Sequence, residues 1–170
     1  MFQNKKVNTA QGMEKGSLPY LEARNRSARM NLLLILAMTL VNIFLIFGDS
    51  QLYYLFSALL PYWLVGFGYY NHVMILMIAG GVILALYLVF FLLWNKHPAF
   101  SIASLVLFVI DCIFLVWFCL GEPLEDNLMD IVFHIAVLAY LAYGVYITVS
   151  LHKKRKAKAV PQQTAQGPEF

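Results

Sequence analysis

Four long runs of apolar residues, each almost free of charged side chains, dominate the chain. They cover residues 30–48, 73–94, 99–120 and 131–151. In lipid, a single apolar run of about 20 residues satisfies its backbone hydrogen bonds as a helix. Only residues 95–98 separate the second and third runs, so these two helices are expected to be antiparallel neighbours. The pattern predicts an all-α fold: an integral membrane four-helix bundle made of two antiparallel transmembrane hairpins.

Residues 49–72, between the first two runs, fit neither a loop nor a span well. They are apolar and rich in Tyr and Trp, and Pro61, Gly66 and Gly68 interrupt them. Tyr and Trp favour the headgroup level of a membrane, where the ring is in an apolar layer and its polar tip is wet. We therefore predict an interfacial or re-entrant segment with a short helix near residues 52–60. The alternative is a fifth span.

Charge distinguishes between these two alternatives. Charged residues make up 12% of the chain and hydrophobic residues 61%, and a soluble protein carries about twice that share of charge. All 12 Lys and Arg fall in residues 1–29, at Lys96, or in residues 152–170. Four spans put these three places on one side of the membrane, whereas a fifth would separate the two basic tails. The positive-inside rule then predicts a multi-pass protein of the bacterial cell (cytoplasmic) membrane with both termini in the cytoplasm.

The two tails are expected to be basic cytoplasmic segments. Residues 1–29 contain no apolar core, so we expect no signal peptide at Met1, and Met13 is an alternative start. Within this tail, residues 18–29 are either disordered or a short amphipathic helix on the membrane surface. Residues 152–170 are expected to be disordered. Both tails predict contact with anionic lipid of the bilayer, and nucleic acid is not expected as a partner.

Asp111 is the most conspicuous candidate for chemistry. A carboxylate near the bilayer centre costs about 3 kcal/mol on insertion scales, so it should face protein or water, in its neutral form. At 1.5 Å per residue from the outer ends of the spans, Asp111, Thr39 and Tyr140 count to a depth of roughly 15 Å. Asn42 and His134 count to roughly 6–9 Å. We predict a polar column of these five side chains, which either binds a proton, a cation or a small polar ligand, or joins the helices by hydrogen bonds.

Two further features concern packing and reactivity. Gly80 and Gly81, at the centre of the second run, predict close approach of a neighbouring helix, with a kink as the alternative. Cys112 and Cys119 lie two turns apart on one helix, too distant to bridge each other, and are expected to behave as small apolar residues. The sequence contains no His-Glu-x-x-His, Gly-x-Ser-x-Gly or phosphate-binding glycine loop. It therefore predicts no catalytic residues, no metal and no cofactor.

The stretch Thr39-Leu40-Val41-Asn42, followed by Leu55-Phe56-Ser57-Ala58-Leu59-Leu60-Pro61-Tyr62, resembles a pattern in small, uncharacterised integral membrane proteins of Gram-positive bacteria. The resemblance covers about a quarter of the chain and implies no activity. It draws attention to Ser57, Pro61 and Tyr62, which are otherwise expected to be interfacial, as is Trp63.

Taken together, these features predict a non-enzymatic accessory or interaction subunit. We expect it to pair through the face of Gly80 and Gly81, as a homo-oligomer or in a larger membrane complex. The alternative is a small transporter or channel subunit that moves protons or cations through a site at Asp111. A lipid-modifying membrane enzyme is a third hypothesis.

Overall fold

The chain is almost entirely helical in a computed structural model that describes residues 13–50, 52–121 and 124–164. Its elements are α1 (Leu18–Phe47), α2 (Leu59–Tyr70), α3 (Met74–Leu93), α4 (Pro98–Cys119) and α5 (Leu124–Thr164). Within these residues, α1, α3, α4 and most of α5 are long and apolar enough to cross a membrane. The predicted all-α fold with four spans is therefore confirmed.

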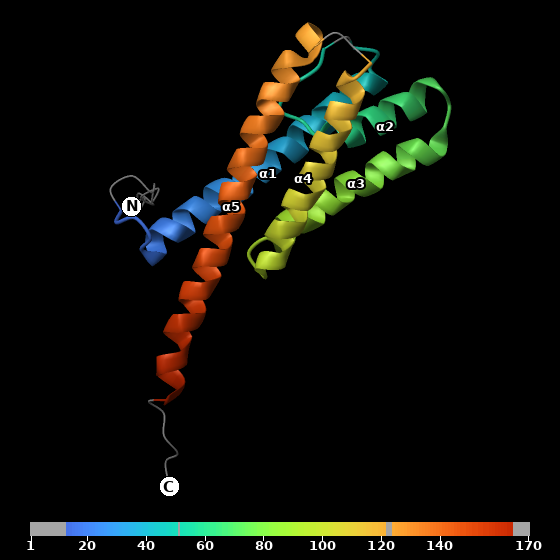
Figure 1. Ribbon diagram of the computed structural model, residues 1–170. Coiled ribbons are helices and arrows are strands. Elements are labelled where there is room, and N and C mark those ends of the chain that lie inside the picture. Colours follow the sequence, from blue (N-terminus) through green and yellow to red (C-terminus); the bar gives the residue numbers. More distant parts are fainter. Residues whose placement is uncertain (1–12, 51, 122–123, 165–170) are drawn as a thin grey trace, which may run out of the picture.

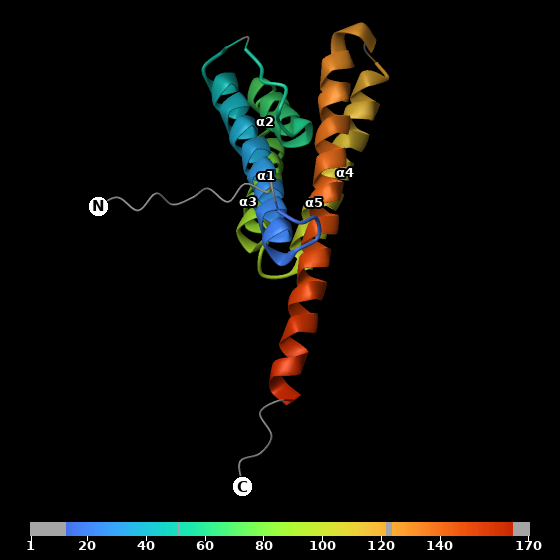
Figure 2. The ribbon, with the colours of Figure 1, turned by 90° about the vertical axis from the view of Figure 1, so that its left-hand side faces the viewer.

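The helices form two groups that meet along α1 and α5. Figure 2 shows α1, α2 and α3 on one side and α4 with α5 on the other. Where α1 crosses α5, a Cβ added at Gly144 would lie 2.6 Å from the Cβ of Ala28, so only glycine permits this approach. The hydrophobic core between the groups includes Leu32, Tyr87 and Trp94.

The helix ends and turns lie at two opposite ends of the bundle. The start of α1, the α3–α4 turn and the lower part of α5 gather at one end, and the α2–α3 and α4–α5 turns lie at the other (Figure 1). The described Lys and Arg residues lie in the segments at the first of these two ends. We call this the basic end of the bundle, and the opposite one the acidic end, because Asp49 and the start of α5 lie there.

Two helices are longer than the sequence predicts. α1 begins at Leu18, because Ser17 accepts a hydrogen bond from the backbone N–H of Tyr20 (3.4 Å) and a proline occupies the first turn. α5 begins at Leu124 and continues to Thr164, so residues 152–164 are helical and their predicted disorder is wrong. Lys and Arg favour helix, and Arg155 contacts Glu22 of α1 at 2.8 Å. The predictions for residues 1–12 and 165–170 lie outside the described residues.

The short helix of the segment 49–72 is α2, and its predicted position at residues 52–60 is wrong. After α1, none of the described residues 48–50 and 52–58 is helical, and we call these residues the re-entrant loop. α2 then runs back toward the acidic end (Figure 1). Twelve helical residues span about 18 Å, which is little more than half the hydrocarbon thickness. The segment therefore begins and ends at the same end of the bundle, as the predicted interfacial or re-entrant segment requires and a fifth span does not.

Candidate functional site

Asp111 of α4 caps the first turn of α2. Its Oδ2 accepts a hydrogen bond from the backbone N–H of Leu59 (3.0 Å), and its Oδ1 accepts one from Leu60 (2.6 Å). The first four N–H groups of a helix have no partner within it, and the residue before α2, Ala58, has no capping side chain. The third residue of α2 is Pro61, which has no N–H. The carboxylate of Asp111 thus supplies, from a distant helix, the cap that the local sequence lacks.

His134 of α5 lies against the same carboxylate. Its Nε2 is 3.1 Å from Asp111 Oδ2, and its Nδ1 is 2.8 Å from the backbone oxygen of Asp130. Since a carbonyl only accepts, Nδ1 carries a proton. Nε2 and Oδ2 would repel each other if both were bare, so the pair holds one further proton between them. Both side chains are buried, with 1% of Asp111 and 3% of His134 exposed, and the ring of Phe108 stacks on the imidazole at 5.6 Å.

Thr39 and Asn42 of α1 hold the re-entrant loop on the other side. Thr39 Oγ1 donates to the carbonyl of Ile35 (2.7 Å) and accepts from the N–H of Ala58 (2.8 Å). Asn42 Oδ1 accepts from the N–H of Tyr54 (2.9 Å), and its Nδ2 donates to Tyr54 O (2.8 Å) and Ser57 Oγ (2.9 Å). In a helix over residues 52–60 the N–H of Ala58 would bond to the carbonyl of Tyr54, but Thr39 takes this N–H and Asn42 takes this carbonyl. This is the physical reason for the extended loop.

The structure therefore brings together four of the five residues of the predicted polar column: Asp111, His134, Thr39 and Asn42. The fifth, Tyr140, is six residues beyond His134 and packs against the hydrophobic core instead. No known protein family, curated protein or solved structure matches this chain. The binding of a ligand or ion by these four residues stays a prediction.

Two of the residues expected at the membrane interface are enclosed by protein. Ser57 is 3% exposed and Pro61 is buried in the first turn of α2, so neither faces the headgroups. Tyr62 and Trp63 are half-buried: the ring of Tyr62 lies 5.0 Å from that of Tyr53, and Trp63 stacks on Phe67 at 4.9 Å.

The two central glycines of α3 have different surroundings. A Cβ added at Gly80 would lie 2.7 Å from Val65 Cγ2 and 2.8 Å from the carbonyl oxygen of Pro61, so this glycine lets α2 pack directly on α3. A Cβ at Gly81 would meet nothing within 4 Å. The close-packing interpretation thus describes Gly80, and Gly81 faces outward.

The sequence-based reasoning missed a polar cluster centred on Asn25. Asn25 Oδ1 accepts from Trp94 Nε1 (2.9 Å) and from the hydroxyl of Thr148 (2.7 Å), and its Nδ2 donates to Asn95 Oδ1 (2.9 Å). It ties α1, α5 and the α3–α4 turn together at the basic end. Asn25 lies in a stretch that was expected to be a tail, and its polar surroundings in the sequence give no sign that it is buried.

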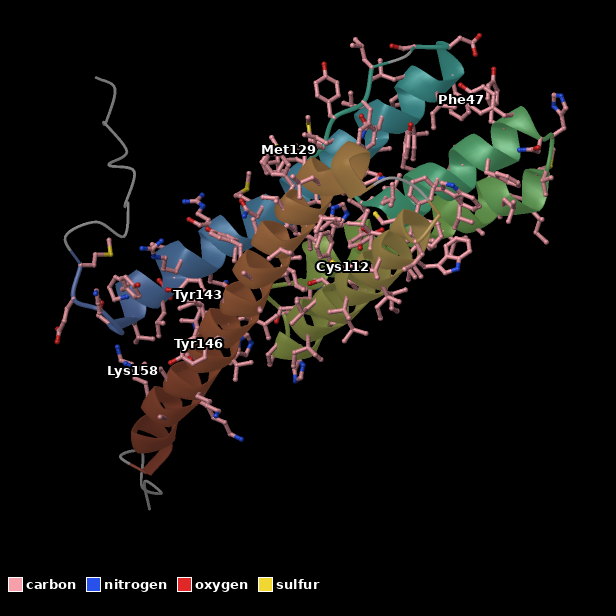
Figure 3. All side chains as sticks on the ribbon, turned by 45° about the horizontal axis from the view of Figure 1, so that its top comes forward. Phe47, Cys112, Met129, Tyr143, Tyr146 and Lys158 are labelled. Atoms are coloured by element: carbon pink, nitrogen blue, oxygen red, sulfur yellow. The ribbon has the colours of Figure 1, made fainter. Side chains whose placement is uncertain are left out.

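The Asp111–His134 pair has the groups needed to hold or pass a proton. Among the described residues, no three His, Cys, Asp or Glu side chains gather as a metal site would require. His134 borders a cavity of about 300 Å³ between α4 and α5, whose other lining side chains are apolar or thiol groups such as Cys112, Leu115 and Leu138. Cys112, which follows Asp111, lies where α4 and α5 run side by side (Figure 3).

Proposed function

We propose that this chain is a non-enzymatic membrane subunit that works by association with other helices in the membrane. The observation that carries the proposal is the outer face of α3. Only Gly80 and Tyr87 of this helix are buried, although it has the length and composition of a span. Gly81 and Ala85, one turn apart, are both exposed. Small residues at this spacing allow two membrane helices to approach closely.

The internal polar groups support the same proposal. Asp111, Thr39 and Asn42 bond to the re-entrant loop and to the start of α2. Their hydrogen bonds serve the architecture of the subunit, which leaves the outer surfaces as the means by which it acts. The partner is a second copy of the chain or a different membrane protein.

The test is to block the outer face of α3 with bulk. The double variant Gly81→Leu and Ala85→Leu should fold as the wild type does, because both positions are open, and should lose cross-linked or co-purifying partners from native membranes. Ala142→Leu, a small-to-large change at an exposed position of α5, is the matched control. If the double variant keeps its partners, or if the control loses them equally, α3 is not the association surface.

A second candidate is proton movement through Asp111, favoured by the deeply buried Asp111–His134 pair. Intramembrane carboxylates paired with histidine are typical of proton relays. In liposomes with an entrapped pH dye, a relay predicts proton flux that is lost in Asp111→Asn and in His134→Gln. Wild-type liposomes without flux above that of empty liposomes would exclude this function and leave the association proposal standing.

We also propose that the protein lies in a bacterial cytoplasmic membrane with its basic end in the cytoplasm. The support is the concentration of Lys and Arg at that end and the resemblance to Gram-positive membrane proteins. Single cysteines at the basic and acidic ends, in a chain whose Cys112 and Cys119 are replaced by alanine, should react with a membrane-impermeant maleimide only at the acidic end of intact cells. Labelling of the basic end would refute this orientation.

A further inference from the structure

A polar cavity of about 520 Å³ opens at the basic end of the bundle, between the first turns of α1, the α3–α4 turn and α5. Its polar lining comes from Glu22, Asn25, Arg26, Arg29, Asn95 and Arg155. Figure 3 shows the first turns of α1 beside the part of α5 that carries Tyr143 and Tyr146, and the hydroxyls of Tyr20 and Tyr143 are 3.4 Å apart. The cavity is thus framed by three separate parts of the chain.

The lining carries an excess of positive charge. Three arginines and one glutamate give a net charge of +2, by 3 − 1, and the glutamate, Glu22, is already paired with Arg155 at 2.8 Å. Arg26 and Arg29 remain. Within the described residues, no carboxylate pairs with either of them. An anion entering this cavity would therefore meet two arginines whose charge is not neutralised by the protein.

Arg29 is held in place before any ligand arrives. Its Nε donates to the backbone oxygen of Phe91 (3.1 Å), and its guanidinium lies over the Phe91 ring, 4.5 Å from the centroid. This bond uses the Nε–H and leaves the two terminal amino groups as donors. A guanidinium with a fixed stem and free terminal N–H groups suits phosphate oxygens, since its fork of donors binds two oxygens at once.

The back wall of the cavity is equally fixed. Asn25 is 8% exposed, and its bonds to Trp94, Thr148 and Asn95 use both ends of its amide. Beside these polar groups lie Ala23, Pro19 and Leu151. The cavity therefore offers cationic donors together with an apolar side, which matches a ligand whose phosphate is attached to an apolar body.

We propose that this cavity binds the headgroup phosphate of an anionic glycerophospholipid, with Arg26 and Arg29 as its cationic contacts. The cavity lies beside the α3–α4 turn, where α3 ends and α4 begins, and lipid phosphates are found at the level where membrane helices end. Basic pockets between spans at such a level recognise lipid headgroups. The site is independent of the association proposed for α3, and either is testable without the other.

The test measures binding of single lipids to the purified full-length chain in detergent, by native mass spectrometry. Phosphatidylglycerol should bind more tightly than zwitterionic phosphatidylcholine. Arg26→Gln with Arg29→Gln should weaken binding of phosphatidylglycerol by about tenfold or more, which corresponds to the loss of one charge-assisted hydrogen bond of about 1.4 kcal/mol. Arg26 is exposed and makes no hydrogen bond or ion pair with another described residue, so Arg26→Gln alone should weaken binding in the same direction without disturbing the fold.

The matched control removes two positive charges elsewhere. Arg24, whose guanidinium lies over the Tyr20 ring at 5.5 Å, and the exposed Lys153 do not line the cavity, so Arg24→Gln with Lys153→Gln should leave the affinity within about twofold. An equal loss in both double variants would overturn the site in favour of general charge attraction. If millimolar inorganic phosphate displaced the lipid completely, the cavity would be a site for free phosphate and the proposal of a lipid ligand would be refuted.

Discussion

Replacing Asp111 with asparagine tests whether the carboxylate is the cap of α2. The side chain would keep one oxygen, enough for one of the two backbone N–H groups that the carboxylate now accepts at 2.6 and 3.0 Å. The new NH₂ group would face the second N–H, donor against donor. A buried N–H without an acceptor costs about 1–3 kcal/mol, so Asp111→Asn should lower the free energy of unfolding by about 2 kcal/mol. Asp111→Leu also leaves His134 unpaired and should cost about 3–5 kcal/mol.

The assay is reversible unfolding in mixed micelles, together with hydrogen exchange read at Leu59 and Leu60. The control is Ser104→Ala on the same helix, because this buried hydroxyl donates only to the carbonyl of Ser101 (2.8 Å) in its own helix. It should lower stability by about 1 kcal/mol or less. If Asp111→Asn left the stability and both exchange rates unchanged, the capping role would be refuted.

Four other changes probe the contacts that hold the helices and the re-entrant loop together. Gly80→Ala should destabilise the protein by about 1–3 kcal/mol, since its methyl would meet α2 at 2.7 and 2.8 Å. Gly81→Ala, in open space, should be neutral or stabilising by up to about 1 kcal/mol. Equal effects of Gly80→Ala and Gly81→Ala on the free energy of unfolding would contradict the packing of α2 on α3. Asn42→Ala removes three hydrogen bonds to the re-entrant loop and should speed its hydrogen exchange at least about tenfold; unchanged exchange would mean that the loop is held in another way. Asn25→Leu takes the acceptor from Trp94 and should destabilise by about 2 kcal/mol, with a shift in tryptophan emission; an unchanged spectrum and stability would contradict the cluster.

The spans follow from composition, but their ends depend on contacts that composition does not report. Hydropathy predicts four helices because lipid leaves the backbone no alternative. It places the start of the last span at residue 131, whereas α5 begins at Leu124. That difference explains why the depth predicted for His134, roughly 6–9 Å, is too small. His134 is ten residues into α5, and Asp111 is eight residues before the end of α4 at Cys119. The two residues therefore meet at one level, and Tyr140 is too far along α5 to join them.

The segment of residues 49–72, which contains the re-entrant loop and α2, shows a different limit of the sequence. Its aromatic residues and Pro61 indicate a segment that does not span. Its conformation, however, is decided by side chains on α1 and α4 that bond to its backbone, among them Thr39 and Asp111. The sequence of residues 49–72 alone gives no information about these partners. Short helices whose caps come from elsewhere in the chain are for this reason the least predictable part of such a fold.

The cap of α2 also sets the order in which the protein is built. Asp111 follows Leu59 by 52 residues, so a ribosome has finished α2 and α3 long before it makes the residue that satisfies the start of α2. A nascent chain that stops after α3 leaves bare N–H groups which lipid does not tolerate. α2 therefore reaches its final position only after α4 has been inserted, and the helices cannot fold one at a time in the order of the sequence.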